Sequence, residues 1–193
     1  SMLGRITQEQ HEFDSSTAKI QAVRSVHLRM LRQLYEQLSA SVLKAQLYPL
    51  AAALQAKGLK LGLRKIYVQT FERVRQMLHK AQTSGSEIFD MLGGTFRQLN
   101  AEFGFSLQVP SVPNLQVFEQ ELLDIEQRHL QYIGMGNALR LAQPEFTHRL
   151  ARALALRLRT VFDAAANELE NWSKAATAQL DAQLRERKRS FVR

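Results

Sequence analysis

The five histidines are the first residues to test for chemistry, because imidazole serves as a metal ligand and as a general base near neutral pH. No two of them have the spacing of a helical ligand pair, and H-E-x-x-H does not occur. The chain has no cysteine, which excludes disulfides and thiolate metal sites. We therefore predict surface or core roles, and no metal site, for all five: His11, His27, His79, His129 and His148.

Four carboxylates within residues 119–126 are the second candidate for chemistry. They spread around the helix predicted there, so we interpret them as a solvated acidic face turned toward basic helices: Glu119, Glu121, Asp124 and Glu126. No serine stands in a G-x-S-x-G turn, and the glycines of residues 58–62 and 93–94 lack the spacing and terminal Lys-Ser/Thr of a phosphate loop. We predict no catalytic residue and no cofactor-binding residue, so this chain is not expected to be an enzyme.

The elements that carry these residues are long helices. Of the 193 residues, 45% are hydrophobic, and only nine are glycine and four proline. Runs of Leu, Ala, Gln, Arg and Glu favour helix, and apolar residues recur at steps of three and four. No apolar run approaches the roughly 18 residues of a membrane span, and the N-terminus lacks an apolar signal segment. We therefore expect a cytoplasmic chain.

Turn signals divide the chain into one all-α domain, an elongated antiparallel bundle over residues 14–193. Pro49 predicts a kink in the first helix, and the connector 104–113 combines a glycine stop with two prolines that favour extended backbone. Residues 1–13 are interpreted as an expression-tag scar and a loose N-terminus, so the chain is expected to be a piece of a larger protein. The predicted helices are 15–57, 63–103, 114–133 and 144–190.

Apolar stripes predict which side chains these helices bury. The stripe of the last helix advances by about 3.7 residues per step, which is typical of a nearly straight bundle and not of a leucine zipper. Its members are Leu154, Leu158, Val161, Ala165, Leu169, Trp172, Ala176 and Leu180. The stripe predicted for the first helix is Ile20, Val23, His27, Met30, Leu34, Leu38, Val42 and Ala45.

Positive charge is the strongest pointer to a partner. The formal net charge is +8, which favours anionic partners such as nucleic acid, lipid headgroups or an acidic protein surface. Residues 63–80 and 185–193 each hold five Lys or Arg against one Glu. The second cluster gives a secondary basic patch made of Arg185, Arg187, Lys188 and Arg189.

The nine residues "KGLKLGLRK", 57–65, interrupt the helical pattern with two glycines, three leucines and four cations. Leu59 and Leu63 are in phase with Ile66, as residues of a helix seam would be, whereas packing explains Leu61 least. The segment is either a plain turn or a contact with a membrane or another anionic partner. The contact hypothesis assigns Lys57, Lys60, Leu61, Arg64 and Lys65.

Two longer phrases carry a resemblance to a known family. They are "RQLNAEFGFSLQVPSVPNLQVFEQEL" (97–122) and "NELENWSKAATAQLDAQLRERKRSFVR" (167–193). They resemble the helical region that follows the GTPase domain in proteobacterial dynamin-like GTPases. The resemblance implies a stalk of long antiparallel helices that couples nucleotide-driven changes to self-assembly and membrane remodelling. It also implies GTP, magnesium and a GTPase domain in the parent protein, and none of the family's GTPase residues has a counterpart here.

Three functions remain open at this point. The first is a non-catalytic stalk-like module that self-associates and lies peripherally at the inner membrane. The second is a free-standing helical adaptor that binds a protein partner. The third is a basic nucleic-acid-binding protein, which charge alone suggests, because no recognition helix or aromatic stacking platform is evident. The resemblance favours the first.

Overall fold

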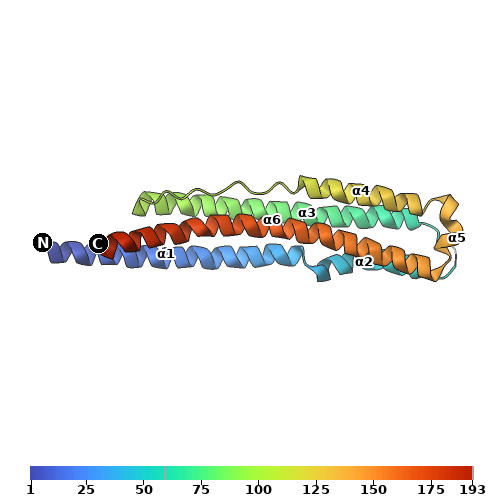
Figure 1. The fold of residues 1–193 in the computed structure, drawn as a ribbon, viewed down its shortest axis with the longest axis horizontal. Helices are drawn as coiled ribbons and strands as arrows, with labels where there is room; N and C mark the ends of the chain where they lie inside the picture. Colours follow the sequence, from blue (N-terminus) through green and yellow to red (C-terminus); the bar gives the residue numbers. More distant parts are fainter. Residues whose placement is uncertain (59, 193) are drawn as a thin grey trace. The chain divides into compact units, whose positions relative to one another are not determined.

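The computed structural model describes residues 1–58 and 60–192, which form helices and connections without a strand. The all-α helical-bundle class predicted from the sequence is confirmed (Figure 1). A short 3₁₀ turn, η1, covers Met135–Asn137. The α-helices are α1 (Met2–Gln37), α2 (Ala40–Gln55), α3 (Leu63–Phe103), α4 (Gln116–Tyr132), α5 (Ala138–Leu141) and α6 (Pro144–Val192).

The chain divides into two compact units, where the sequence predicted one bundle over residues 14–193. Unit 1 is Ser1–Leu34, Ser84–Pro113 and Glu168–Arg193. Unit 2 is Tyr35–Thr83 and Asn114–Asn167. Helices α1, α3 and α6 contribute residues to both.

The N-terminal residues are helical, so the prediction of a loose segment at 1–13 is wrong. Helix α1 begins at Met2, and the Ser1 hydroxyl accepts a hydrogen bond from the Gly4 N–H at 3.2 Å. Side chains through Glu12 are exposed. The absence of a long apolar stripe therefore misled the prediction, because a helix needs only its backbone hydrogen bonds and good helix formers to extend past its packed part.

The first predicted helix is divided at Leu38 and Ser39, not simply kinked at Pro49, which lies inside α2. Ser39 caps α2: its backbone is extended, and its hydroxyl accepts from the Val42 N–H at 3.4 Å. The break adds one residue between buried positions, so the predicted Val42 and Ala45 are not buried. The side chains that α2 buries are instead Leu43, Leu47, Leu50 and Leu54.

Unit 1 packs three helices and one extended segment. Gly104, whose φ of 68° ends α3, is the first residue of the segment 104–113. This segment runs beside α3 and α6, where a fourth helix would lie in a bundle (Figure 1). Side-chain amides hold the backbone of this segment. Asn100 makes two hydrogen bonds with the backbone of Leu107, both 2.9 Å, and Gln179 pairs with both backbone groups of Gln108.

Gly85 has a packing role in unit 1. Helix α3 continues through it without interruption. A Cβ at Gly85 would stand 3.2 Å from Val112 Cγ1 and 3.6 Å from Leu169 Cδ2. The missing side chain therefore lets the extended segment and α6 approach α3 closely.

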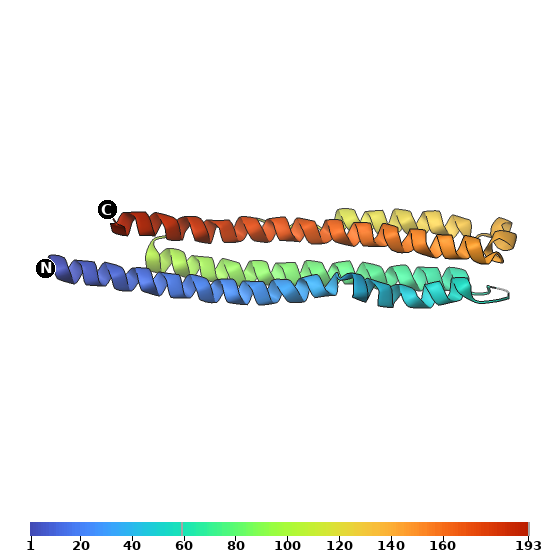
Figure 2. The same ribbon diagram turned by 60° about the horizontal axis from the view of Figure 1, so that its bottom comes forward.

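Unit 2 packs α2 and α4 with the first half of α3 and the first half of α6. The chain runs one way in α2 and α4 and the opposite way in α3 and α6 (Figures 1 and 2). The α6 stripe predicted from the sequence is confirmed along its whole length, with every member at most 5% exposed. In α3, Leu63 is buried but Ile66 is only half-buried, and Tyr67 takes the buried place. Leu59, the third member of that predicted seam, lies outside the described residues.

Candidate functional site

Two connections lie at the same end of unit 2 (Figures 1 and 2). One joins α2 to α3 through residues 56–62, and the other joins α4 to α6 through residues 133–143, which include η1 and α5. They are neighbours, because Lys57 and Lys60 of the first share a cleft with Ala142 of the second. We call the described residues of these two connections, with the first turns of α3 and α6, the basic end of unit 2.

Glycine geometry shapes the first connection. Gly58 and Gly62 have φ angles of 92° and 74°, which side chains other than glycine rarely adopt. The Lys60 ammonium folds back and donates a hydrogen bond to the Ala56 carbonyl at 2.6 Å. Since Ala56 is the C-cap of α2, this lysine satisfies a carbonyl that the helix end leaves free. Lys60, half-buried, therefore has a structural role as well as its charge.

Leu61 points outward. Its side chain is 84% exposed, whereas its neighbour Leu63 is 4% exposed and belongs to the core. Lys57, Arg64 and Lys65 are exposed too. The sequence-predicted contact residues thus lie together on one connection and the helix turn that follows it.

The first turn of α3 breaks a rule of helix electrostatics. It carries Arg64 and Lys65 and no acidic residue. A helix N-terminus bears partial positive charge, which favours Asp or Glu there and disfavours cations by a few tenths of a kcal/mol, up to about 1. A local rule broken without compensation inside the fold is expected where a residue serves a contact outside it.

Leu139 is the residue that sequence reasoning missed. It lies in the short helix α5 and is 85% exposed, beside the exposed Arg140. A four-residue helix is too short to show a periodic pattern, so no apolar stripe marked Leu139 as an exception. Single exposed leucines are ordinary on protein surfaces. Two leucines on adjacent connections, both more than four-fifths exposed and each next to a cation in the chain, are less ordinary.

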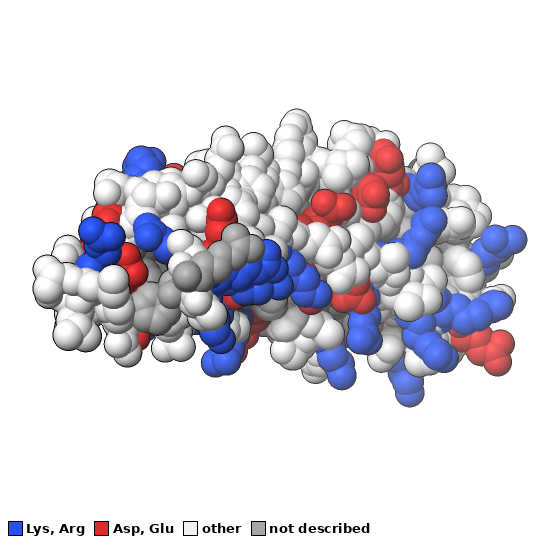
Figure 3. All heavy atoms as spheres, turned by 60° about the vertical axis from the view of Figure 1, so that its left-hand side comes forward, with Lys and Arg blue, Asp and Glu red and all other residues white. Residues whose placement is uncertain are grey.

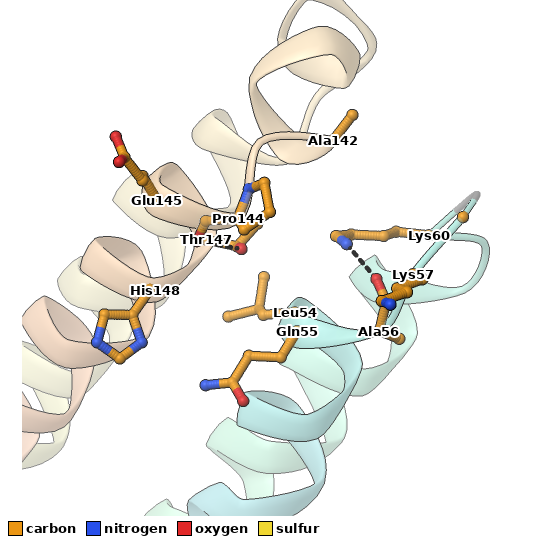
Figure 4. A pocket seen from close by; sticks show the side chains of 11 residues that line it. Leu54, Gln55, Ala56, Lys57, Lys60, Ala142, Pro144, Glu145, Thr147 and His148 are labelled. Atoms are coloured by element: carbon orange, nitrogen blue, oxygen red, sulfur yellow. Dashed lines mark hydrogen bonds between the residues drawn. The ribbon is translucent and has the colours of Figure 1, made fainter.

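The cleft of the basic end has a volume of about 800 Å³ and mixed lining. Figure 4 shows Lys60 extending between the two connections toward Pro144, with Leu54 on the floor below. Glu145 points away from the loop in the same view. Thr147 bonds to the carbonyls of Gln143 and Pro144, so its hydroxyl proton is engaged in the start of α6.

The secondary basic patch belongs to unit 1, at the end of α6. Arg185, Arg187, Lys188 and Arg189 are exposed. Arg187 also lies over the ring of Phe105, with the guanidinium carbon 5.5 Å from the ring centre. In the view of Figure 3, basic side chains are spread over the surface with acidic ones among them. Charge of this kind does not identify a partner.

The acidic residues of α4 are partly structural, so their interpretation as a solvated face holds only for Glu121 and Asp124. Glu126 is 7% exposed and accepts a hydrogen bond from Arg75 at 2.9 Å. Glu119 pairs with His79 at 3.0 Å. These two carboxylates bind α4 to α3.

Two of the five histidines, His27 and His129, are buried, and the other three are exposed. His27 is buried in unit 1, and its Nε2 shares a 2.7 Å hydrogen bond with the Ser173 hydroxyl. Burial lowers the pKa of His27. With both partners at most 5% exposed, no substrate reaches this pair, and it specifies packing between α1 and α6. Within residues 1–58 and 60–192, no three His, Asp or Glu side chains are arranged to hold a metal ion.

Comparison with known protein families, with curated proteins and with solved structures found no match. None of the helices in the described part of the chain combines the length and the apolar character that crossing a bilayer requires.

Proposed function

We propose that this chain is a non-catalytic helical module that binds an anionic membrane surface through the basic end of unit 2 and self-associates there. Such a module would act like the stalk of a dynamin-like GTPase, coupling a nucleotide-binding domain in the parent protein to membrane remodelling. The observation that carries the proposal is the pair of outward leucines, Leu61 and Leu139, 84% and 85% exposed among cations.

The energies are large enough for reversible binding. Each cation near an anionic bilayer contributes about 1 kcal/mol, so Lys57, Arg64, Lys65 and Arg140 together supply on the order of 4 kcal/mol. Each leucine that enters the interface adds roughly 1.5–3 kcal/mol. One copy would therefore bind weakly, and several associated copies would bind firmly, because linked contacts multiply.

Co-sedimentation with vesicles tests the proposal. The chain is mixed with vesicles of phosphatidylcholine alone and with vesicles that also contain phosphatidylglycerol. We expect binding to the anionic vesicles only, rising more steeply than linearly with protein concentration if copies associate. The double variant Leu61→Ser/Leu139→Ser should lose most of it, about tenfold or more, from the leucine contribution.

The matched control is Leu156→Ser on α6, where the replaced leucine is 67% exposed and outside the basic end. It should bind as the unchanged chain does. Neutralising Lys57, Lys60, Arg64 and Lys65 to glutamine should also weaken binding and reduce its salt dependence. Equal binding by the unchanged chain and the leucine double variant would refute membrane contact at this end, and a strictly linear concentration dependence would refute association on the membrane.

A further inference from the structure

A second cavity of unit 2 gathers arginines without acidic partners. It has a volume of about 670 Å³ and lies among α4, α5 and α6. Three arginines line it, Arg140 from α5 and Arg149 and Arg157 from α6, and its described lining includes no Asp or Glu. The ion pairs of the described residues involve other cations. The charge of this cavity is therefore not compensated within the described fold.

Helical spacing explains how α6 presents its share. Phe146, Arg149, Leu150, Ala153 and Arg157 follow each other at steps of one, three and four, so they share one face of the helix. Arg149 and Arg157 are two turns apart, about 12 Å along the axis. Ala153 lies between them, so no bulky side chain of α6 fills the face between the two arginines.

The rest of the lining is a buried ring and two exposed polar side chains. His129 of α4 is 3% exposed and lines the cavity, and its Nδ1 has no hydrogen-bond partner. Burial, together with the nearby charge of Arg157, lowers the pKa of His129 to about 4, so the ring is neutral at pH 7. Tyr132 and Gln143 bring further polar groups to the rim. The His129 Nδ1 nitrogen is itself buried, so leaving it without a partner is a cost to the fold, and it is not a group that a ligand in the cavity contacts in this structure.

We infer that this arginine-lined cavity of unit 2 binds a phosphate-bearing ligand with more than one negative charge. Guanidinium groups present planar, paired N–H donors that match phosphate oxygens, which makes arginine the preferred residue for such recognition. The three arginines supply the charge, Gln143 supplies a neutral hydrogen-bonding group, and Phe146 and Leu150 form an apolar wall. The ligand is either a soluble phosphate compound or the phosphate monoester of a lipid headgroup.

The site adjoins the membrane contact proposed above and shares Arg140 with it, but it uses neither of the exposed leucines and none of the cations of residues 57–65. Its test is isothermal titration calorimetry of the full chain with inorganic pyrophosphate in the absence of lipid. Arg149→Gln/Arg157→Gln should weaken binding at least about tenfold, because hydrogen bonds to a charged group each contribute on that order. Arg152→Gln is the matched control, since Arg152 is exposed on the same helix but faces the side of α2.

A lipid arm distinguishes the two sources of phosphate. The same variants are sedimented with phosphatidylcholine vesicles that contain phosphatidic acid, and circular dichroism checks that each variant is folded. If the unchanged chain and Arg152→Gln bind pyrophosphate and the Arg149/Arg157 variant does not, the ligand is a soluble phosphate compound. If no protein binds pyrophosphate, and only the Arg149/Arg157 variant loses binding to vesicles that contain phosphatidic acid, the ligand is a lipid headgroup. The proposal is wrong if the Arg149/Arg157 variant binds both probes as strongly as the unchanged chain does. It is also wrong if Arg152→Gln loses as much binding as the Arg149/Arg157 variant.

Discussion

Replacing Asn100 with alanine should release the extended segment of unit 1 from α3. The Asn100 amide donates to the Leu107 carbonyl and accepts from the Leu107 N–H, both at 2.9 Å. Each neutral hydrogen bond contributes about 0.5–1.5 kcal/mol, so losing two lowers the free energy of unfolding by about 1–3 kcal/mol. Leu107 is 6% exposed, and water therefore replaces the lost partner poorly, which places the effect in the upper part of that range.

Gln179→Ala is the matched comparison. Gln179 makes the same pair of bonds with the backbone of Gln108, at 2.9 and 2.5 Å, but at an exposed position. Water can take over both bonds there, so we expect a loss below about 1 kcal/mol. Both side chains hold the segment through the same pair of amide hydrogen bonds, so the two predictions differ only because one pair is buried and the other is exposed.

Urea unfolding followed by circular dichroism gives the stability change, and amide hydrogen exchange gives its location. In Asn100→Ala the Leu107 amide should exchange faster, while amides in the middle of α3 keep their relative protection. If Asn100→Ala unfolds at the same urea concentration as the unchanged chain, the two Asn100 hydrogen bonds do not stabilise the extended segment. Equal losses in the two variants would also contradict the prediction, because burial would then have no influence.

Two further predictions concern unit 2. Burial first, and then the charge of Arg157, lower the pKa of His129 from 6.5 to about 4, so the unfolded chain takes up this proton first. The contribution of His129 to stability is complete above pH 6.5, and roughly 3 kcal/mol of it is lost as the pH falls toward 4. Urea unfolding at several pH values measures this loss. The His129→Leu variant should lose less stability over the same pH interval. Glu126→Ala removes a nearly buried carboxylate that pairs with Arg75, and it should lower the free energy of unfolding by about 1–3 kcal/mol, measured by thermal or urea unfolding. Glu72→Ala removes an exposed carboxylate that pairs with the same arginine, and it should change stability much less. Equal effects of the two substitutions would contradict the role of burial.

The helices could be predicted because each carries its own periodic signal. The α6 stripe from Leu154 to Leu180 and the bounds of α3 follow from apolar spacing and from glycine and proline signals alone. The break before α2 could not be found in this way. Leu38 fits the α1 stripe and Leu43 fits the α2 stripe, and only the cap at Ser39 shows that the phase changes between them. A serine is common enough in helices that its presence did not signal a cap.

Only one of the two connections that form the basic end of unit 2 was identified from the sequence. The segment 57–65 drew attention by its glycines and lysines, and Leu61 stood out because it fitted no seam. Leu139 and Arg140 had no such context, since α5 has four residues. The arginine-lined cavity was invisible as well, because it combines side chains from α4, α5 and α6 that are separated by up to 28 positions in the chain, from His129 to Arg157.

The sequence by itself determined that this protein is helical, where most of its helices begin and end, and which face of α6 is buried. These properties depend on neighbours within one or two turns, and the spacing of apolar residues records them directly. The tertiary structure decided that residues 104–113 are held as an extended chain by Asn100 and Gln179, and that two connections meet at one end of unit 2. Both depend on contacts between residues far apart in the chain, which no local pattern encodes.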